Sequence, residues 1–445
     1  MNAIKNQLIT ITCLFMIVIG AIQATALSKD GSNDSGILGN EVTERIEMTL
    51  AGKSGMDVTL EHSFGDIDIR TGASDKIVLI GEKRVIAKNK AITAEFLSKM
   101  KLVVAERSNS VRIVTEYPDE KSLKRKVKRF SISYSIEVPA DIRLNVKNSF
   151  GEIDITGVSG DIDITNGYGK LTARDLKGTT TLANKFGAIA AFNINGDTEI
   201  ISAHSPLDIQ DIYGNLTAET RHGSIKILHV EGNARIECGH GSVRCDDISG
   251  RTDIVNSHGK VECRNIGDEI DIHNSHGSVV VEDAQSRARV RTSFSRATVL
   301  RINGDVIVEN EHGSVEAETI NGNAEVNTTF GTVRIDQVKG DVLVTNHHGK
   351  ISVQNILTEP SSTSRSVRLK STYGSINLRV PESFSANITA STSFGKFACD
   401  FPLYMSLGKE GLSSGNSQRV TGKIGDGKDT VILETSHSNI SLEKM

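Results

Sequence analysis

A ring-bearing residue returns every 18 residues along the middle of the chain, and this spacing constrains the fold more than any other feature. In twelve consecutive copies the position is aromatic or His, and Gly follows it in most of them. No copy carries an insertion. A spacing this strict is typical of a stack in which each repeat rests on the one before it. The ring positions are Phe150, Tyr168, Phe186, His204, His222, His240, His258, His276, Phe294, His312, Phe330 and His348.

Apolar and polar residues alternate between the rings, which predicts two short strands in each repeat. The positions three, eight and fourteen residues after the ring are apolar, beginning with Ile153, Val158 and Ile164 in the first copy. Gly recurs ten residues after the ring, as at Gly160, and predicts a second corner with positive φ. The alternative is a series of β-hairpins in a flat meander or a closed barrel, but hairpins would tolerate changes in the length of the repeat. We therefore expect parallel strands in register, with like side chains about 4.8 Å apart.

A polar residue precedes each ring by two positions, and Asn is the commonest choice. Stacked Asn amides can bond to their copies along the axis and to the turn backbone. This predicts a structural ladder that contains Asn148, Asn166, Asn184, Asn256, Asn274, Asn310 and Asn346.

These patterns predict an all-β chain, a parallel β-solenoid of 18-residue, two-strand rungs capped at both ends. One helix is expected in the N-terminal cap, from Ala91 to Met100. The expected parts are a signal peptide (1–26), a flexible linker (27–40), an N-terminal β-rich cap with the first rungs (41–147), the regular solenoid (148–357) and C-terminal irregular rungs with a cap (358–445).

The N-terminus predicts export. Lys5 precedes an uncharged apolar run from Leu8 to Ile22, and Ala24-Thr25-Ala26 forms a small-residue cleavage site. An uncleaved anchor is the alternative, although the run is short for a spanning helix. We expect no transmembrane segment after cleavage, and a periplasmic, outer-surface or secreted protein. The net charge of −4 gives no chain-wide field for nucleic acid.

The stretch from Ile136 to Val146, leading into Ser149-Phe150-Gly151, resembles the entry of the bacterial putative-adhesin family of exported, Gly-rich β-solenoid domains. A second stretch that resembles this entry runs from Leu378 to Gly395. The segment Gly422 to Gly427 is similar to the C-terminal end of that family's domain. The resemblance covers about residues 40–445. It implies a right-handed solenoid in the envelope or at the surface, with a largely unknown function and without catalytic residues.

The His column is a candidate metal site, because His222, His240, His258 and His276 occupy four consecutive rungs. Stacked imidazoles can bind Zn, Cu or Ni. The simpler interpretation is that this corner requires a flat ring, since Phe and Tyr fill it elsewhere.

Three further groups of residues have both a structural and a chemical interpretation. Cys245 and Cys263 share one column, where their spacing permits a disulfide but the small apolar column favours two buried thiols. The basic run Lys121 to Arg129 can contact anionic glycan or lipid headgroups, or can protect a strand edge. Acidic pairs such as Asp66 with Asp68 suggest either a hydrolase or a solvated outer face.

We expect a non-enzymatic, adhesin-like scaffold or binding module, because stacking explains every recurring column. Its expected partner is an envelope or surface protein or a glycan, and self-association through solenoid ends or faces is a further option. No nucleophile elbow, phosphate loop or HExxH motif occurs, so no catalytic residue and no cofactor are predicted. The alternatives are a carbohydrate-active solenoid enzyme, a polysaccharide lyase or hydrolase, and a metal-binding protein that uses the His column.

Overall fold

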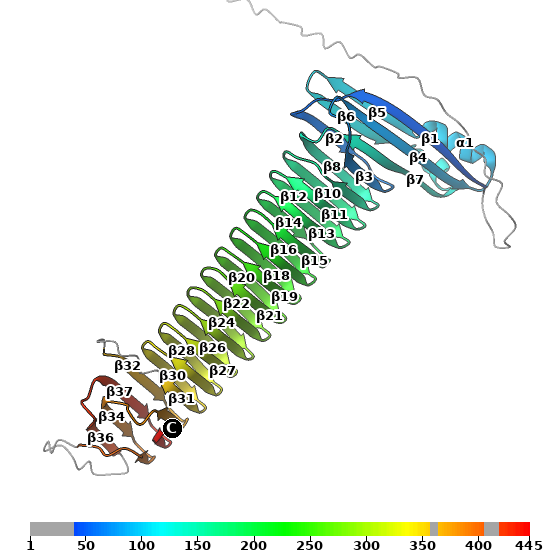
Figure 1. The fold of residues 1–445 in the computed structure, drawn as a ribbon. Coiled ribbons are helices and arrows are strands. Elements are labelled where there is room, and N and C mark those ends of the chain that lie inside the picture. The colour runs from blue at the N-terminus through cyan, green and yellow to red at the C-terminus, as the bar shows by residue number, and fades with distance from the viewer. Residues whose placement is uncertain (1–39, 357–363, 405–417) are drawn as a thin grey trace, which may run out of the picture. The chain divides into compact units, whose positions relative to one another are not determined.

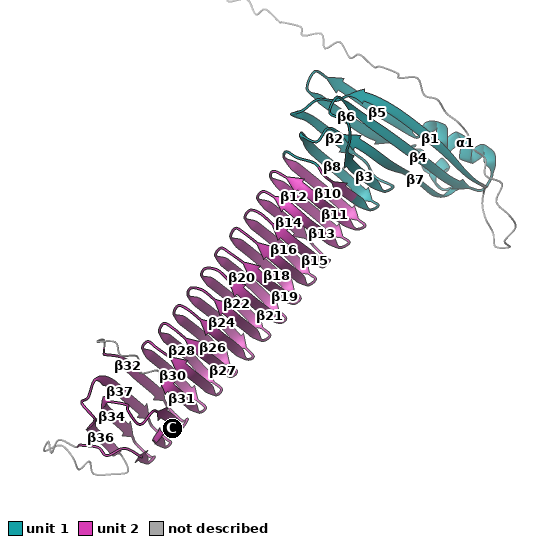
Figure 2. Ribbon diagram, in the orientation of Figure 1, with its two compact units in different colours: residues 1–153, 158–160 teal, residues 154–157, 161–445 magenta. Residues whose placement is uncertain are grey.

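The computed structural model describes residues 40–356, 364–404 and 418–445 (Figure 1). The predicted signal peptide and linker lie outside this part of the chain, except for Asn40. Contacts divide the chain into two compact units, which Figure 2 shows in different colours. Unit 1 comprises residues 1–153 and 158–160, and unit 2 comprises residues 154–157 and 161–445. Strand β9 (Ile153–Thr156) lies at the division.

The described part of unit 1 contains two sheets and two helices. In one sheet the order is β1-β4-β7-β3, where β4 is antiparallel to both β1 and β7, and β3 is parallel to β7. In the other the order is β5-β6-β2-β8, with β5 antiparallel to β6 and the remaining pairs parallel. The elements are β1 (Asn40–Ala51), β2 (Met56–Glu61), β3 (Ile67–Thr71), β4 (Lys76–Ala87), α1 (Lys90–Lys99), β5 (Lys101–Arg107), β6 (Ser110–Glu116), α2 (Lys121–Lys124), β7 (Val127–Val138) and β8 (Ile142–Phe150).

Helix α1 confirms the helix expected at Ala91 to Met100, shifted by one residue. The side chain of Asn89 caps it by accepting a hydrogen bond from the Ile92 amide at 2.9 Å. Helix α2 was not predicted. The basic run Lys121 to Arg129 begins with this helix, so the run does not form one continuous strand.

Unit 2 is a stack of two-strand rungs with two parallel sheets facing each other (Figure 1). The first sheet, sheet A, contains β11 (Leu171–Lys177), β13 (Ile189–Asn195), β15 (Leu207–Ile212), β17 (Ile225–Val230), β19 (Val243–Ile248), β21 (Val261–Ile266), β23 (Val279–Ala284), β25 (Ala297–Ile302), β27 (Val315–Ile320), β29 (Val333–Val338), β31 (Ile351–Ile356), β33 (Ile376–Val380), β38 (Ile440–Lys444) and β35 (Phe397–Cys399).

The second sheet, sheet B, supplies the other strand of each rung. It contains β10 (Ile162–Tyr168), β12 (Thr180–Phe186), β14 (Thr198–Ser202), β16 (Leu216–His222), β18 (Ala234–His240), β20 (Thr252–His258), β22 (Ile270–His276), β24 (Ala288–Phe294), β26 (Val306–His312), β28 (Ala324–Phe330), β30 (Val342–His348), β32 (Ser366–Ser371), β37 (Asp429–Thr435), β34 (Ala386–Thr392) and β36 (Gln418–Ile424).

The register confirms a parallel β-solenoid with an 18-residue rung. His222 pairs with His240 and His240 with His258, and sheet A shows the same step from Ile225 to Val243. The inward columns are apolar and buried, as Ile236 and Ile254 illustrate at 0% and 1% exposure. Each strand thus covers the core of its neighbour, and the stack buries a continuous interior.

The prediction of positive φ at the second corner holds only for the first copies. Gly160 has a φ of 106°, but Gly232 and Gly250 do not lie in the left-handed region. Gly is required there for another reason, since a Cβ on Gly232 would lie 2.4 Å from the carbonyl oxygen of Gly214. Close approach of successive turns, and not the backbone angle, explains this column.

A different column carries the left-handed backbone. It lies seven residues after the ring, near the end of the sheet A strand, and its member is Gly only after Phe150, where Gly157 has a φ of 80°. Asp and Asn are common in it, as expected of residues that tolerate this conformation. Its other members are Asp175, Asn193, Asp211, His229, Asp247, Asn265, Asp283, Arg301, Thr319, Gln337 and Asn355, with φ between 53° and 61°.

Candidate binding surface

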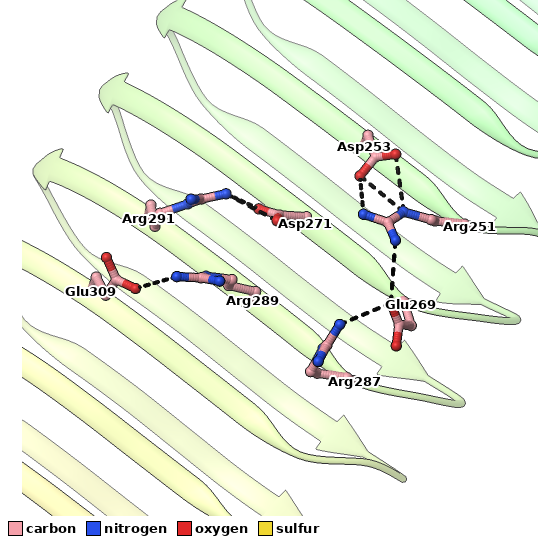
Figure 3. A network of polar contacts seen from close by, with 8 residues as sticks. All are labelled: Arg251, Asp253, Glu269, Asp271, Arg287, Arg289, Arg291 and Glu309. Atoms are coloured by element: carbon pink, nitrogen blue, oxygen red, sulfur yellow. Dashed lines mark hydrogen bonds and ion pairs between the residues drawn. The ribbon is translucent and has the colours of Figure 1, made fainter.

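The outer face of sheet B carries a network of alternating charges in the middle of unit 2 (Figure 3). Strand side chains on this face point away from the core because successive residues alternate in direction. Arg289 and Arg291 project from β24, and Arg287 directly precedes that strand. The rungs on either side supply the carboxylates. The network consists of Arg251, Asp253, Glu269, Asp271, Arg287, Arg289, Arg291 and Glu309.

Arginines of β24 bind carboxylates from both neighbouring rungs. Arg291 Nη2 donates to both carboxylate oxygens of Asp271 at 2.8 and 2.9 Å. On the other side, Arg289 Nη2 donates to Glu309 Oε1 at 2.7 Å. The hydrogen bond to Glu309 raises the pKa of Arg289 above its usual value. Charge complementarity between rungs therefore holds these guanidinium groups in a fixed pattern.

Glu269 joins two further arginines. Arg287 Nη2 donates to Glu269 Oε2 at 3.0 Å, and Arg251 Nη1 reaches the same oxygen at 3.5 Å. Arg251 also binds Asp253, which raises the pKa of Arg251. These side chains remain between about one third and one half exposed. Pairs this exposed contribute little to stability, typically about 0.2–1 kcal/mol each, but they remain accessible to a partner.

The predicted His column lies on another edge of unit 2, where its rings stack face to face. Ring centroids of His222, His240, His258 and His276 are 4.6 to 4.9 Å apart, with interplanar angles of 2° to 19°. The stack runs on in both directions through Phe and Tyr rings. Because each ring covers its neighbour, the edges and not the faces of these rings meet solvent.

Metal binding by His222, His240, His258 and His276 stays a prediction. Ligand nitrogens lie about 2.0–2.1 Å from a zinc ion, so they must converge on one point. Parallel rings keep equivalent atoms at the spacing of the stack. In the described part of the chain, no three His, Cys, Asp or Glu side chains are arranged to hold a metal ion.

The Asn column binds mainly the turn backbone. Asn274 Nδ2 donates to the carbonyl oxygens of Gly277 at 2.8 Å and Gly259 at 3.1 Å, and so joins two successive turns. Asn184 and Asn346 bind two Gly carbonyls in the same way. The bond along the axis that the sequence suggested is seen between Asn256 and Asn274 at 3.3 Å.

The cysteines of unit 2 are thiols. Cys245 and Cys263 lie in register on neighbouring strands, both are buried, and neither forms a disulfide. A hydrogen bond from one thiol to the other, together with burial, raises the pKa of Cys263 well above its usual value. This agrees with the expectation of two buried thiols, and the raised pKa makes Cys263 a poor nucleophile.

A buried histidine in unit 1, His62, lies two residues before Phe64, whose ring stacks on Phe150 with centroids 5.2 Å apart. His62 is 5% exposed, and its Nδ1 lies 3.0 Å from Thr115 Oγ1, which in turn bonds to the hydroxyl of Tyr134 at 2.8 Å. Burial lowers the pKa of His62 to about 4 and raises that of Tyr134 to about 12. His62 is therefore neutral near pH 7 and belongs to the core.

The acidic pairs lie on exposed surface. Asp68 bonds to Arg70 at 2.8 Å, and Asp154 bonds to Arg174 at 3.3 Å. Salt bridges of this kind fit the solvated outer face that was one of the two interpretations. No helix in the described residues is long and apolar enough to span a membrane.

Comparison with known families identifies part of this architecture. A model of the family described as Toastrack DUF4097 matches residues 268–443. Residues 268–443 are thus similar to the Toastrack family. The Toastrack segment begins just before β22, within the charged network, and ends in β38. The match confirms the resemblance to a family of β-solenoid domains of largely unknown function.

Solved structures of bacterial proteins resemble the chain only weakly. A putative cell adhesion protein from Clostridium sporogenes has 9% identity, 90% of this chain and 100% of that chain covered, and a TM-score of 0.17. A putative lipid binding protein from Parabacteroides distasonis has 10% identity, with 76% of this chain and 93% of that chain covered, and a TM-score of 0.19. A putative adhesin from Bacteroides fragilis has 10% identity, with 90% of this chain and 97% of that chain covered, and a TM-score of 0.14. Scores this low carry no functional argument. No curated protein matches the chain.

The sequence did not predict the charged network as a site. Its members occupy three different offsets within the rung, so no single column reveals them. The signal that was present is the spacing of Arg287, Arg289 and Arg291, which places three cations on one face of a strand.

Proposed function

We propose that the chain is a non-enzymatic, exported, adhesin-like binding module, and that the outer face of sheet B is its binding surface. One observation carries the proposal: Arg287, Arg289 and Arg291 form a half-exposed row that lies between acidic rungs. The parallel stack fixes the spacing of these charges at about 4.8 Å between rungs. A rigid array of this kind suits a partner with repeated polar groups, such as a surface glycan or an envelope protein.

Binding of the labelled chain to bacterial envelope preparations and purified surface polysaccharides tests this proposal. The diagnostic variant replaces Arg287, Arg289 and Arg291 by Gln. We expect saturable binding by the wild type and at least about a tenfold loss in the variant, because interfacial charges of this type are commonly worth more than 1.4 kcal/mol together.

A matched control removes three cations from the outer face of sheet A, through Lys226→Gln, Arg244→Gln and Arg334→Gln. This control should bind like the wild type. Equal losses in both variants would refute the assignment to sheet B. New reducing ends or unsaturated products from any polysaccharide would refute the non-enzymatic part of the proposal and favour the lyase or hydrolase alternative.

A further inference from the structure

Unit 1 gathers a dense group of cations where three of its elements meet. Strand β4 ends at Ala87, Lys88 follows, and helix α1 begins at Lys90. The backbone amide of Lys88 donates to the carbonyl oxygen of Lys126 at 3.4 Å, which brings the start of β7 beside this junction. Helix α2 lies two residues before β7. We name this group the basic patch, and it consists of Lys88, Lys90, Lys121, Arg125, Lys126, Lys128 and Arg129.

The nearby acids are already paired with other lysines. Asp119 binds Lys124 at 3.3 Å, and Glu120 binds Lys99 at 2.8 Å. Within residues 40–356, 364–404 and 418–445, no member of the basic patch forms an ion pair, and every member is exposed. The patch therefore presents uncompensated positive charge to its surroundings.

Protection of a strand edge explains only some of these charges. Strand β7 pairs with β4 from Val127 to Glu137 but with β3 only from Tyr134 to Val138, so the segment with Lys128 and Arg129 is paired with a strand on one side only. Lys121 lies in helix α2 and not in a strand. Protection of a strand edge thus stays an interpretation for Lys128 and Arg129, but it does not extend to Lys121.

The chain leaves unit 1 toward its apolar N-terminal run beside this patch. Strand β1 begins at Asn40, which pairs with Ala87, the residue directly before Lys88. The apolar run ends at Ile22. The 17 residues between Ile22 and Asn40 span at most about 60 Å when fully extended. While Leu8 to Ile22 resides in a bilayer, the basic patch is thus held within reach of that bilayer's surface.

We propose that the basic patch binds the anionic phospholipid headgroups of the membrane from which the chain emerges. Charge complementarity and the position of Asn40 carry this inference together. Each Lys or Arg held near an anionic surface raises partitioning about fivefold, so seven such residues suffice for reversible attachment without a spanning helix. The interaction is electrostatic, because the patch supplies charge and no apolar wedge.

Co-sedimentation with vesicles tests the proposal with the chain from residue 27 onward, which contains all described residues. Vesicles of phosphatidylcholine and phosphatidylglycerol in equal parts should bind the protein, whereas pure phosphatidylcholine vesicles should not. Raising the ionic strength from about 0.01 M to about 0.15 M shortens the screening length from about 30 Å to about 8 Å and should release most of the protein. Salt-insensitive or composition-insensitive binding would overturn the proposal.

Two matched variants locate the interaction. The patch variant carries Lys88→Gln, Lys126→Gln, Lys128→Gln and Arg129→Gln and should lose about 100-fold or more in partitioning. A control variant with the same charge carries substitutions by Gln in unit 2, at Lys170, Lys177, Arg221 and Lys350, and should bind like the wild type.

Circular dichroism verifies that both variants are folded. Equal partitioning of the two variants would overturn the assignment to unit 1. Binding to a soluble sulfated polysaccharide without any binding to vesicles would reassign the patch to a glycan and also overturn the proposal. The patch and the charged network lie in different units, so failure here leaves the sheet B experiment unaffected.

Discussion

Replacement of His62 by Asn should make unit 1 more resistant to acid. His62 is 5% exposed, and burial lowers its pKa from 6.5 to about 4. Asn is the natural choice because Asn148 occupies the same ladder position before the next ring. The substitution keeps a polar side chain in the column but removes its titration.

The sign follows from proton binding. Between about pH 6.5 and pH 4 the unfolded chain binds a proton at His62 that the folded chain excludes, so acid favours unfolding. Stability from the neutral imidazole is fully present above about pH 6.5 and is lost as the pH falls through about 4. A shift of this size corresponds to about 3 kcal/mol.

Urea unfolding followed by circular dichroism at about pH 7 and pH 4 measures the effect. The wild type should lose about 3 kcal/mol more than His62→Asn across this range, since the carboxylates common to both proteins cancel in the difference. Hydrogen exchange of the β2, β6 and β7 amides locates the loss in unit 1. Parallel pH profiles for the two proteins would show that His62 is not buried in its neutral form.

Three other substitutions or treatments test the packing of unit 2. Gly259→Ala should cost about 3 kcal/mol in urea unfolding, because its φ is 126° and a Cβ would lie 2.2 Å from a carbonyl oxygen of the preceding rung; an unchanged midpoint would contradict the close approach. Asn274→Ala should cost about 2 kcal/mol, since it removes two buried hydrogen bonds, and a loss below about 0.5 kcal/mol would contradict the ladder. Cys245 and Cys263 should resist iodoacetamide in the folded chain and react after unfolding, as followed by mass spectrometry; rapid alkylation of the native protein would contradict their burial.

The regular part of the solenoid could be predicted because one register repeats without interruption. The spacing from His222 to His240 fixes which residues pair, and the alternation along each strand fixes which side chains are buried. Neither inference requires knowledge of distant parts of the chain. Local pattern and tertiary structure coincide in a stack whose contacts are all between neighbours.

The turns and ends could not be predicted as well, because different physical effects decide them. The sequence showed the left-handed column, seven residues after the ring, only as an enrichment of Asp and Asn, as at Asp175 and Asn193. Positive φ was instead predicted for the Gly column ten residues after the ring. At the C-terminal end, His437 stacks between Tyr373 and Phe394, so the last ring in sequence is not the last in space. Strand β36 is antiparallel to β34, which no repeat register indicates.

The candidate surfaces depend on residues that the repeat does not specify. Outward positions vary from rung to rung, since stacking constrains the inward columns much more strongly. Arg291 forms its hydrogen bond with Asp271 only because the preceding rung carries a carboxylate within reach on the same face. Such pairs become visible once the strands are placed in register, and not before.

A distance between spin labels on the outer face of sheet B tests the parallel stack most directly. Thr217 and Leu343 are exposed, and seven successive parallel pairings connect them. The labels are attached to Thr217→Cys and Leu343→Cys in a chain that also carries Cys399→Ser. Seven rungs at about 4.8 Å predict a separation near 34 Å by double electron–electron resonance. A separation near 67 Å, expected if both strands of every repeat were neighbours in one antiparallel meander, would contradict the solenoid.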